Sequence, residues 1–495
     1  MDKRFRSNLF KGLASTSFGS IATIGFHFLS ILLMTRYVPK DVLGAYFLAF
    51  AIVQVLGITS GLGLDLTLVK SVAGADRNQQ QDVVASIVTI RFISVTVVGI
   101  IFFAVGRFIL PVFDARLSDF IMLMIPFFIL ASYRDLFLRL MQGVRQFMQH
   151  AVVEILSAVT RVILLIAFHN SLSLQSLLYI EIISQLIEVL LQIFFLRALL
   201  FSLAPNNIKA ESVRNLTRFS TPLYANNVLT LVYDRSSTFL IGALLNPTSV
   251  AAFEVALKIP DGFMRLFNSF IVVYFPNLSN LFAKGHREDA HKMMNRFLVL
   301  LSTGIIFLVL VAFLFGKEIV LVLFSEEYLE VSLAFAFLML NFYLRAVSNI
   351  LGYSLVASGN SSAPVRANIV SSTVNVVASL VLIRAFGYIG AAYSLLLMNV
   401  TSQIIYELLL RRSGLTPYLL GYLKPVLLLT LALSIYWSFG IDSTLLKFLL
   451  VGIYVAGSWL FIGEIRWLSR TAVKRVFSPR VRSKSAWYAI SEDEQ

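Results

Sequence analysis

The chain has 495 residues, of which 58% are hydrophobic and only 14% are charged, whereas a soluble domain averages roughly 25% charged residues. This composition excludes a soluble globular protein and favours a membrane protein, and the absence of cysteine excludes disulfides and thiolate chemistry. The net charge of +14 does not indicate a nucleic-acid partner, because the basic residues flank apolar runs and form no basic domain.

The apolar runs are long enough to cross a bilayer, which takes about 20 residues per helix. The first run follows the basic start MDKRFRSNLFKG; it is too long for a signal-peptide core and has no clear cleavage site. Runs of this length are also too long for barrel strands, so we predict an all-α membrane protein. The fourteen predicted spans are 13–35, 43–64, 83–106, 118–139, 151–169, 174–197, 219–245, 250–282, 297–316, 331–356, 364–385, 388–410, 418–439 and 444–465.

The distribution of Lys and Arg predicts the orientation. With the N-terminus inside, the cytoplasmic segments hold 26 Lys and Arg residues and the outside segments hold 7. Cytoplasmic loops of membrane proteins carry such an excess. We therefore expect a multi-pass protein of the plasma (inner) membrane with both termini in the cytoplasm.

Two pairs of segments indicate an internal repeat. TRYVPKDVLGAYFLAFAI (35–52) matches LLNPTSVAAFEVALKI (244–259) at an offset of 208, and MQGVRQFMQHAVVEI (141–155) matches ASGNSSAPVRANIV (357–370) at an offset of 216. Repeats in membrane proteins are typical of transporters. We predict two six-helix bundles in pseudo-symmetric repeat (1–210 and 211–415), two further helices (416–465) and a basic cytoplasmic tail (466–495). Chance similarity of short apolar strings is the alternative.

No motif indicates an enzyme. The chain contains neither G-x-x-x-x-G-K-[ST] nor H-E-x-x-H. The segment HREDAH (286–291) has two histidines, but a solvated cytoplasmic linker explains it better than a metal site. We predict no catalytic residue, no metal and no cofactor.

Several charged residues lie inside the predicted spans. A charge at the centre of a membrane helix costs about 2.5–3.5 kcal/mol, so most of these side chains should face protein or a water-filled cavity. The bases are Arg91, Arg134, Arg161, Arg235, Lys258, Arg265 and Arg345, and the acids are Asp135, Glu154, Glu181, Glu188, Asp234, Glu254, Asp261 and Glu407.

The segment FEVALKIPDGFMR (253–265) has two interpretations. Its charges are spaced by 4, 3 and 4 residues, which places them on one face of a helix. Pro260 and Gly262 would also suit a surface turn. We favour one helix kinked at Pro260, because a break there would leave 250–259 too short to cross. The matching segment of the first half lacks these charges, which favours a role in substrate or ion handling over a purely architectural one.

Several segments of the second half of the chain resemble motifs of a known family. FSTPLYANN and YDRSSTFLIGALLNPTSVAAFEVALKI (219–259), YFPNLSNLFAKG (274–285), LVLFSEEYLEVS (321–332) and SGNSSAPVRANIVSSTVNVVASLVLIRAFGYIGAAYS (358–394) resemble motifs of polysaccharide (O-antigen type) flippases. These flippases belong to the multidrug/oligosaccharidyl-lipid/polysaccharide exporter superfamily. The resemblance covers most of the chain.

The resemblance implies a V-shaped pair of bundles and a flippase that works by alternating access. The substrate would be an undecaprenyl-diphosphate-linked oligosaccharide that moves to the outer leaflet for lipopolysaccharide or exopolysaccharide biosynthesis. Arginine can bind a diphosphate bidentately. The expected substrate-binding residues are Arg91, Arg161, Arg235, Lys258, Arg265 and Arg345. The expected ion-coupling residues, for a Na⁺ or H⁺ gradient, are Asp234, Glu254 and Asp261.

The implied partners are the lipid-linked oligosaccharide, membrane lipids, a polysaccharide polymerase and glycosyltransferases, with the protein acting as a monomer. Three alternatives stay open at this point. A multidrug cation antiporter of the same superfamily would favour an acidic cavity, and a flippase for the peptidoglycan lipid precursor shares the diphosphate headgroup. A membrane glycosyltransferase would need a large outer loop, and the outer loops here are short.

Overall fold

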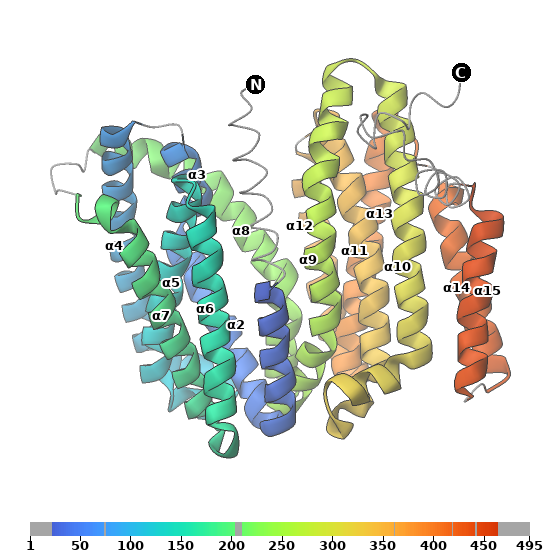
Figure 1. The fold of residues 1–495 in the computed structure, drawn as a ribbon, viewed down its shortest axis with the longest axis horizontal. Coiled ribbons are helices and arrows are strands. Elements are labelled where there is room, and N and C mark those ends of the chain that lie inside the picture. Colours follow the sequence, from blue (N-terminus) through green and yellow to red (C-terminus); the bar gives the residue numbers. More distant parts are fainter. Residues whose placement is uncertain are drawn as a thin grey trace, which may run out of the picture. The chain divides into compact units, whose positions relative to one another are not determined.

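The computed structural model describes residues 22–73, 76–202, 210–360, 362–417, 419–440 and 443–463. Every regular element in these ranges is helical, and Figure 1 shows long helices grouped side by side. Twelve of the described helices are long and apolar enough to cross a membrane. The predicted all-α membrane fold is confirmed. The predicted basic tail (466–495) lies outside the described residues.

The helices follow the predicted spans closely. Residues 22–37 are helical, and the first half continues with α2 (Lys40–Gly61), α3 (Leu64–Ala73), α4 (Arg77–Ile109), α5 (Ile121–Gly143), α6 (Phe147–Ala167) and α7 (Leu174–Leu200). The chain goes on with α8 (Ala210–Leu244), α9 (Pro247–Ala283), α10 (Arg287–Leu323), α11 (Ser332–Ala357), α12 (Ala363–Phe386), α13 (Tyr388–Arg412), α14 (Leu419–Ser438) and α15 (Thr444–Phe461). Short 3₁₀ turns are η1 (Leu110–Val112), η2 (Ala115–Ser118), η3 (His169–Ser171) and η5 (Glu326–Val331).

The predicted span 43–64 is wrong at its C-terminal end. Leu62 and Gly63 have φ angles of 50° and 71°, which end α2 in the left-handed region before α3 begins. A Cβ on Gly63 would lie 2.5 Å from the carbonyl oxygen of Ser220 on α8. Glycine is therefore required there for two reasons, its backbone conformation and the close approach of α8.

At its other end, α2 meets the start of α9. A Cβ built on Gly44 would lie 1.7 Å from the carbonyl oxygen of Pro247, so no side chain fits between the two backbones. The neighbouring residues Leu43, Ala45 and Leu48 are fully buried. Helix α2 is thus a central element of the packing rather than a lipid-facing one.

Helix α9 runs without interruption from Pro247 to Ala283, with Pro260 and Pro276 inside it. The segment 253–265 is therefore helical, as predicted, and the turn interpretation is wrong. A helix can continue through a proline at the cost of one backbone hydrogen bond, which neighbouring groups or water can compensate in a membrane protein.

The helices pack into two compact units. The first comprises Met1–Lys258, Leu323–Ser325 and Ser379–Ala391, and the second comprises Ile259–Val322, Glu326–Ala378 and Ala392–Gln495. Helix α8 falls in the first unit because it packs against α2, α3 and α4. These packing units are not the predicted sequence repeats, so the predicted repeat boundary near residue 210 stays a prediction.

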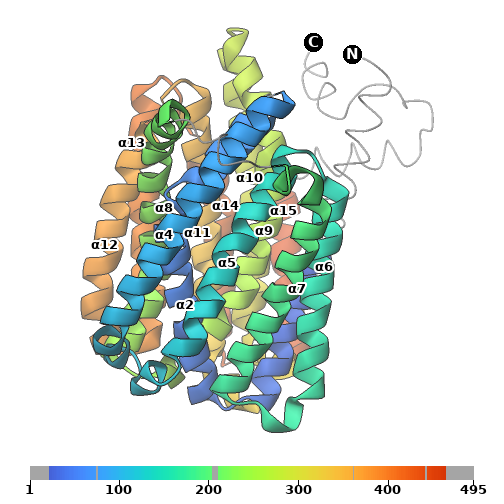
Figure 2. The ribbon, with the colours of Figure 1, turned by 90° about the vertical axis from the view of Figure 1, so that its left-hand side faces the viewer.

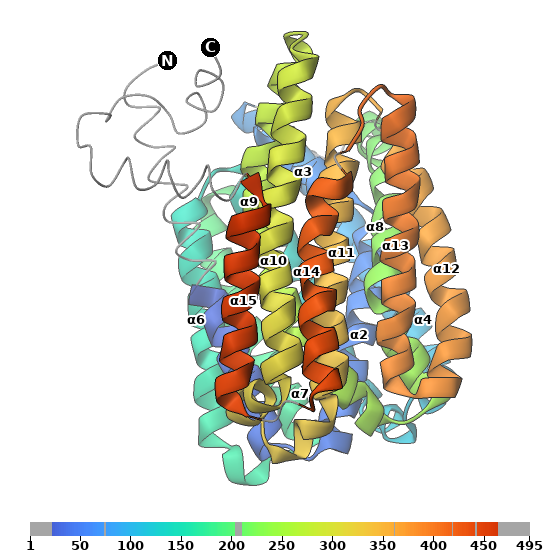
Figure 3. The same ribbon diagram turned by 90° about the vertical axis from the view of Figure 1, so that its right-hand side faces the viewer.

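In the first unit, α5, α6 and α7 lie side by side (Figures 1 and 2), and α7 packs against both others. In the second unit, α15 is joined to α10, which Figure 3 shows beside it. The Tyr454 hydroxyl donates to the carbonyl of Thr303 at 2.9 Å, and Lys447 Nζ pairs with Glu318 at 2.6 Å. The two C-terminal helices, which also pack on each other, are thereby attached to this unit.

Candidate functional site

The best candidate site is a group of four side chains in the first unit, Arg235 and Thr238 on α8 with Glu254 and Lys258 on α9. We call it the Glu254 cluster. Lys258 Nζ donates to Glu254 Oε2 at 2.6 Å, and the Thr238 hydroxyl donates to Glu254 Oε1 at 2.7 Å. Arg235 Nη1 donates to the same Oε1 at 3.3 Å. One carboxylate is therefore stabilised by two cations and a hydroxyl.

Local sequence explains how these residues meet. The Asn246 side chain accepts from the backbone N–H of Ser249 at 2.8 Å and so caps the start of α9, just after α8 ends. This short connection places α9 next to α8. Glu254 lies two turns into α9, and Lys258 follows it by four residues on the same face.

Burial within the Glu254 cluster is uneven. The Glu254 side chain is 2% exposed, whereas the Arg235 and Lys258 side chains are each 21% exposed. Lys258 Nζ also lies 4.6 Å from the centre of the Phe47 ring on α2, within the range of a cation–π contact. The carboxylate is thus enclosed, whereas both cations keep part of their surface accessible. The two positive charges and one negative charge leave the cluster with a net charge of one positive.

A second buried glutamate forms another group, which we call the Glu181 cluster: His27, Tyr46, Arg161 and Glu181. The Tyr46 hydroxyl donates to Glu181 Oε1 at 2.6 Å, and Arg161 Nη2 donates to Glu181 Oε2. Arg161 Nη1 also lies 3.3 Å from Nδ1 of His27. Glu181 is 2% exposed, and here one cation balances one carboxylate.

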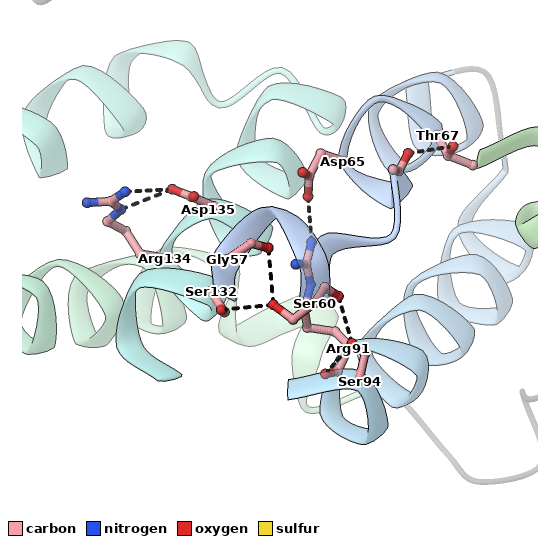
Figure 4. Close-up of polar contacts among 10 residues, drawn as sticks. Gly57, Ser60, Asp65, Thr67, Arg91, Ser94, Ser132, Arg134 and Asp135 are labelled. Atoms are coloured by element: carbon pink, nitrogen blue, oxygen red, sulfur yellow. Dashed lines mark hydrogen bonds and ion pairs between the residues drawn. The ribbon is translucent and has the colours of Figure 1, made fainter. Parts of the chain in front are cut away.

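Arg91 stabilises the break between α2 and α3 (Figure 4). Its side chain is 1% exposed, and its Nη2 pairs with Asp65 of α3 at 2.5 Å. One turn further along α4, the Ser94 hydroxyl donates to the carbonyl of Ser60 at 2.7 Å, close to where α2 ends. These contacts give Arg91 a structural task in this unit.

The remaining predicted residues are on α8, α9 and α11. Asp234 is exposed on α8, Asp261 is half-buried and Arg265 is exposed on α9, and Arg345 is half-buried on α11. Of the six predicted substrate-binding residues, Arg235 and Lys258 contact the same acid, Glu254. The predicted roles in substrate binding and ion coupling stay predictions.

Sequence reasoning missed three contributors to the two clusters, Tyr46, Thr238 and His27, and it counted Glu181 only among the in-span acids. Tyr46 and Glu181 are 135 residues apart, and no local spacing connects them. The pair Glu254–Lys258, in contrast, had a signal in its four-residue spacing. Within the described residues, no group of three or more His, Cys, Asp or Glu side chains could hold a metal ion.

Residues 9–282, more than half of the chain, match the family model described as polysaccharide biosynthesis protein. The chain belongs to this family. Residues 222–381 also match the MatE model. The chain is 22% identical over 395 residues to the probable low-salt glycan biosynthesis flippase Agl15 of Haloferax volcanii, which covers 77% of this chain and 79% of that protein.

Solved structures share the fold of this polysaccharide biosynthesis family member. The inward closed conformation of the lipid II flippase MurJ superposes with a TM-score of 0.73 at 14% identity, covering 90% of this chain and 98% of MurJ. An inward-facing multidrug resistance MATE family transporter of the MOP superfamily superposes with a TM-score of 0.65 at 12% identity. The superposition covers 79% of this chain and 94% of the transporter. The resemblance to the multidrug/oligosaccharidyl-lipid/polysaccharide exporter superfamily is confirmed.

Proposed function

We propose that this protein is a flippase that moves an undecaprenyl-diphosphate-linked oligosaccharide from the inner to the outer leaflet of the plasma membrane, by alternating access, for surface polysaccharide biosynthesis. The observation that carries the proposal is the excess positive charge of the Glu254 cluster inside predicted membrane helices. Family membership and the flippase named among the relatives support it.

The Glu254 cluster has the donors that a diphosphate needs. An arginine side chain has five N–H donors and a lysine ammonium has three. Arg235 and Lys258 each give one hydrogen bond to Glu254 and stay partly exposed, so further donors can reach a phosphate. Glu254 fixes both side chains before a ligand arrives, which lowers the entropy lost on binding.

The lipid tail can remain in the bilayer against apolar helix faces, so the protein has to shield only the headgroup. Partners of this function would be membrane lipids, glycosyltransferases that build the oligosaccharide and a polymerase that receives it. An ion gradient would drive the cycle as in a secondary transporter, without an enzymatic step, and a monomer would suffice.

The test uses the full-length protein in proteoliposomes with a fluorescent undecaprenyl-diphosphate-linked oligosaccharide. Arg235→Ala and Lys258→Ala should each slow flipping about 10- to 100-fold, because a hydrogen bond to a charged group contributes about 1.5–3 kcal/mol. Arg412→Ala, at the exposed end of α13, is the matched control and should flip at the wild-type rate.

Two results would overturn the proposal. One is wild-type flipping in both cluster variants. The other is transport of a lipophilic cation by the same vesicles with no movement of the lipid-linked oligosaccharide, which would identify a cation antiporter.

A further inference from the structure

Helix α7 has a buried polar face that the proposed function does not use. Glu181, Gln185, Glu188 and Gln192 follow one another at intervals of 4, 3 and 4 residues, so they share one face. None of them is more than 7% exposed. Because α7 packs against α5 and α6 (Figure 2), this face points into the first unit. It extends over about 16 Å of helix.

Three polar atoms of two amides on this face lack a hydrogen-bond partner in the described part of the chain. Gln192 is fully buried, and both its Oε1 and Nε2 are without a partner among the described residues, as is Oε1 of Gln185. Leaving such a group unpaired costs about 1–3 kcal/mol, and native proteins usually satisfy it with bound water. A metal cation would satisfy the oxygen of Gln192 but not its N–H, whereas water can satisfy both.

Glu188 lies between these two amides and forms no ion pair within 4.0 Å in the described part of the chain. The charged groups that act on it are Arg134 and Asp135 of α5 and Arg161 of α6, and the Ser157 hydroxyl of α6 also faces it. Both arginines are already paired, Arg134 with Asp135 at 2.8 Å and Arg161 with Glu181. Glu188 is therefore a buried acid without a cation of its own.

Glu254 differs in this respect. Two cations contact its carboxylate directly and favour its ionised form, so protonation would strand both of them. Protonation of Glu188 breaks no ion pair. Of these two buried acids, Glu188 is the better carrier of a proton that has to bind and leave in each cycle.

We propose that the inner face of α7 binds a chain of water molecules and that Glu188 takes up and releases the coupling proton. Uptake transfers a proton from a hydrated neighbour to the carboxylate and gives a neutral carboxylic acid, and release reverses this transfer. Water on this face is inferred from the unpaired atoms of Gln185 and Gln192. The coupling role rests on the proposed flippase function.

The first experiment needs no substrate. Infrared difference spectra of the purified full-length protein, recorded between two pH values, should show the C=O band of a protonated carboxylic acid. This band should disappear in Glu188→Gln and should shift promptly in D₂O, because water reaches the group. In Gln192→Leu the shift should slow at least several-fold, because leucine has no polar atom to hold the water.

The second experiment measures coupling in proteoliposomes. A pH gradient should accelerate flipping by the wild type, and in Glu188→Gln this acceleration should vanish. Glu288→Gln, whose side chain is 83% exposed, is the control and should retain the acceleration.

The proposal is overturned if the carboxylic-acid band survives in Glu188→Gln, or if that variant keeps the full acceleration. If the wild type itself moves no lipid-linked oligosaccharide, the flippase function fails, and the infrared result still decides whether Glu188 exchanges protons with bound water.

Discussion

The Glu254 and Glu181 clusters contain the same parts in different numbers. Each has a glutamate that is 2% exposed and accepts a hydrogen bond from a hydroxyl, at 2.7 Å from Thr238 and at 2.6 Å from Tyr46. The predicted repeat offset of 208 would place Tyr46 opposite Glu254. In that predicted correspondence, the position of a hydroxyl in the first half would hold the carboxylate in the second.

The difference lies in the cations. Glu181 has one arginine and is neutralised by it, whereas Glu254 has two basic partners and cannot neutralise both. A balanced pair mainly joins helices, here α6 and α7 with α2. An unbalanced one leaves charge for a ligand. Both clusters contain a glutamate, a hydroxyl and an arginine, so the roles differ because of the number of cations that contact each glutamate.

The largest effect is expected for Glu254→Ala. Removing one partner of a buried ion pair costs about 3–5 kcal/mol, and this variant strands two cations, so we expect about 5 kcal/mol of lost stability and no flipping. Thermal unfolding of the purified protein measures the loss of stability, and the vesicle assay measures the loss of flipping. A melting temperature within a few degrees of wild type would show that the cations do not depend on Glu254.

Glu181→Ala should cost less, about 3 kcal/mol, because only Arg161 loses its partner. The control is the double variant Glu181→Ala with Arg161→Ala, which leaves no stranded charge and should be more stable than Glu181→Ala alone. Equal losses in the Glu181 and Glu254 variants would contradict the distinction drawn between the clusters.

The smallest effects are expected for the hydroxyls. Tyr46→Phe and Thr238→Val should each cost about 1.5 kcal/mol, the lower end of the range for a hydrogen bond to a charged group, and the two values should be similar. Unfolding midpoints of the two variants, recorded side by side, measure this. A loss confined to one variant would mean that the two hydroxyls do not play matching roles.

The fold could be predicted well from the sequence because its signals are local. Within the described residues, each of the fourteen predicted spans overlaps a helix, since apolar runs of about 20 residues have few other stable forms in a bilayer. Helix α2 ends at Gly61, before the predicted limit of residue 64, because glycine permits a left-handed turn without fixing where it occurs. Leu62, the other left-handed residue, had no sequence signal at all.

The candidate site was only partly predictable. The four-residue spacing of Glu254 and Lys258 anticipated their ion pair, because helix geometry fixes such neighbours. The partners of Arg161 and Arg91 come from other helices, so only the tertiary packing determines them. Knowing that a charge lies in a span therefore does not say whether it contacts a ligand or another side chain.

The contact between Gly44 and Pro247 has a consequence for genetic selection. Any missense codon at position 44 adds at least one carbon where the backbone oxygen of Pro247 already lies, 1.7 Å away. Gly57, on the same helix, has nothing within 4 Å of such a carbon. In a saturation library screened for folded protein in the membrane, codon 44 should therefore be depleted of every substitution, while codon 57 should tolerate alanine.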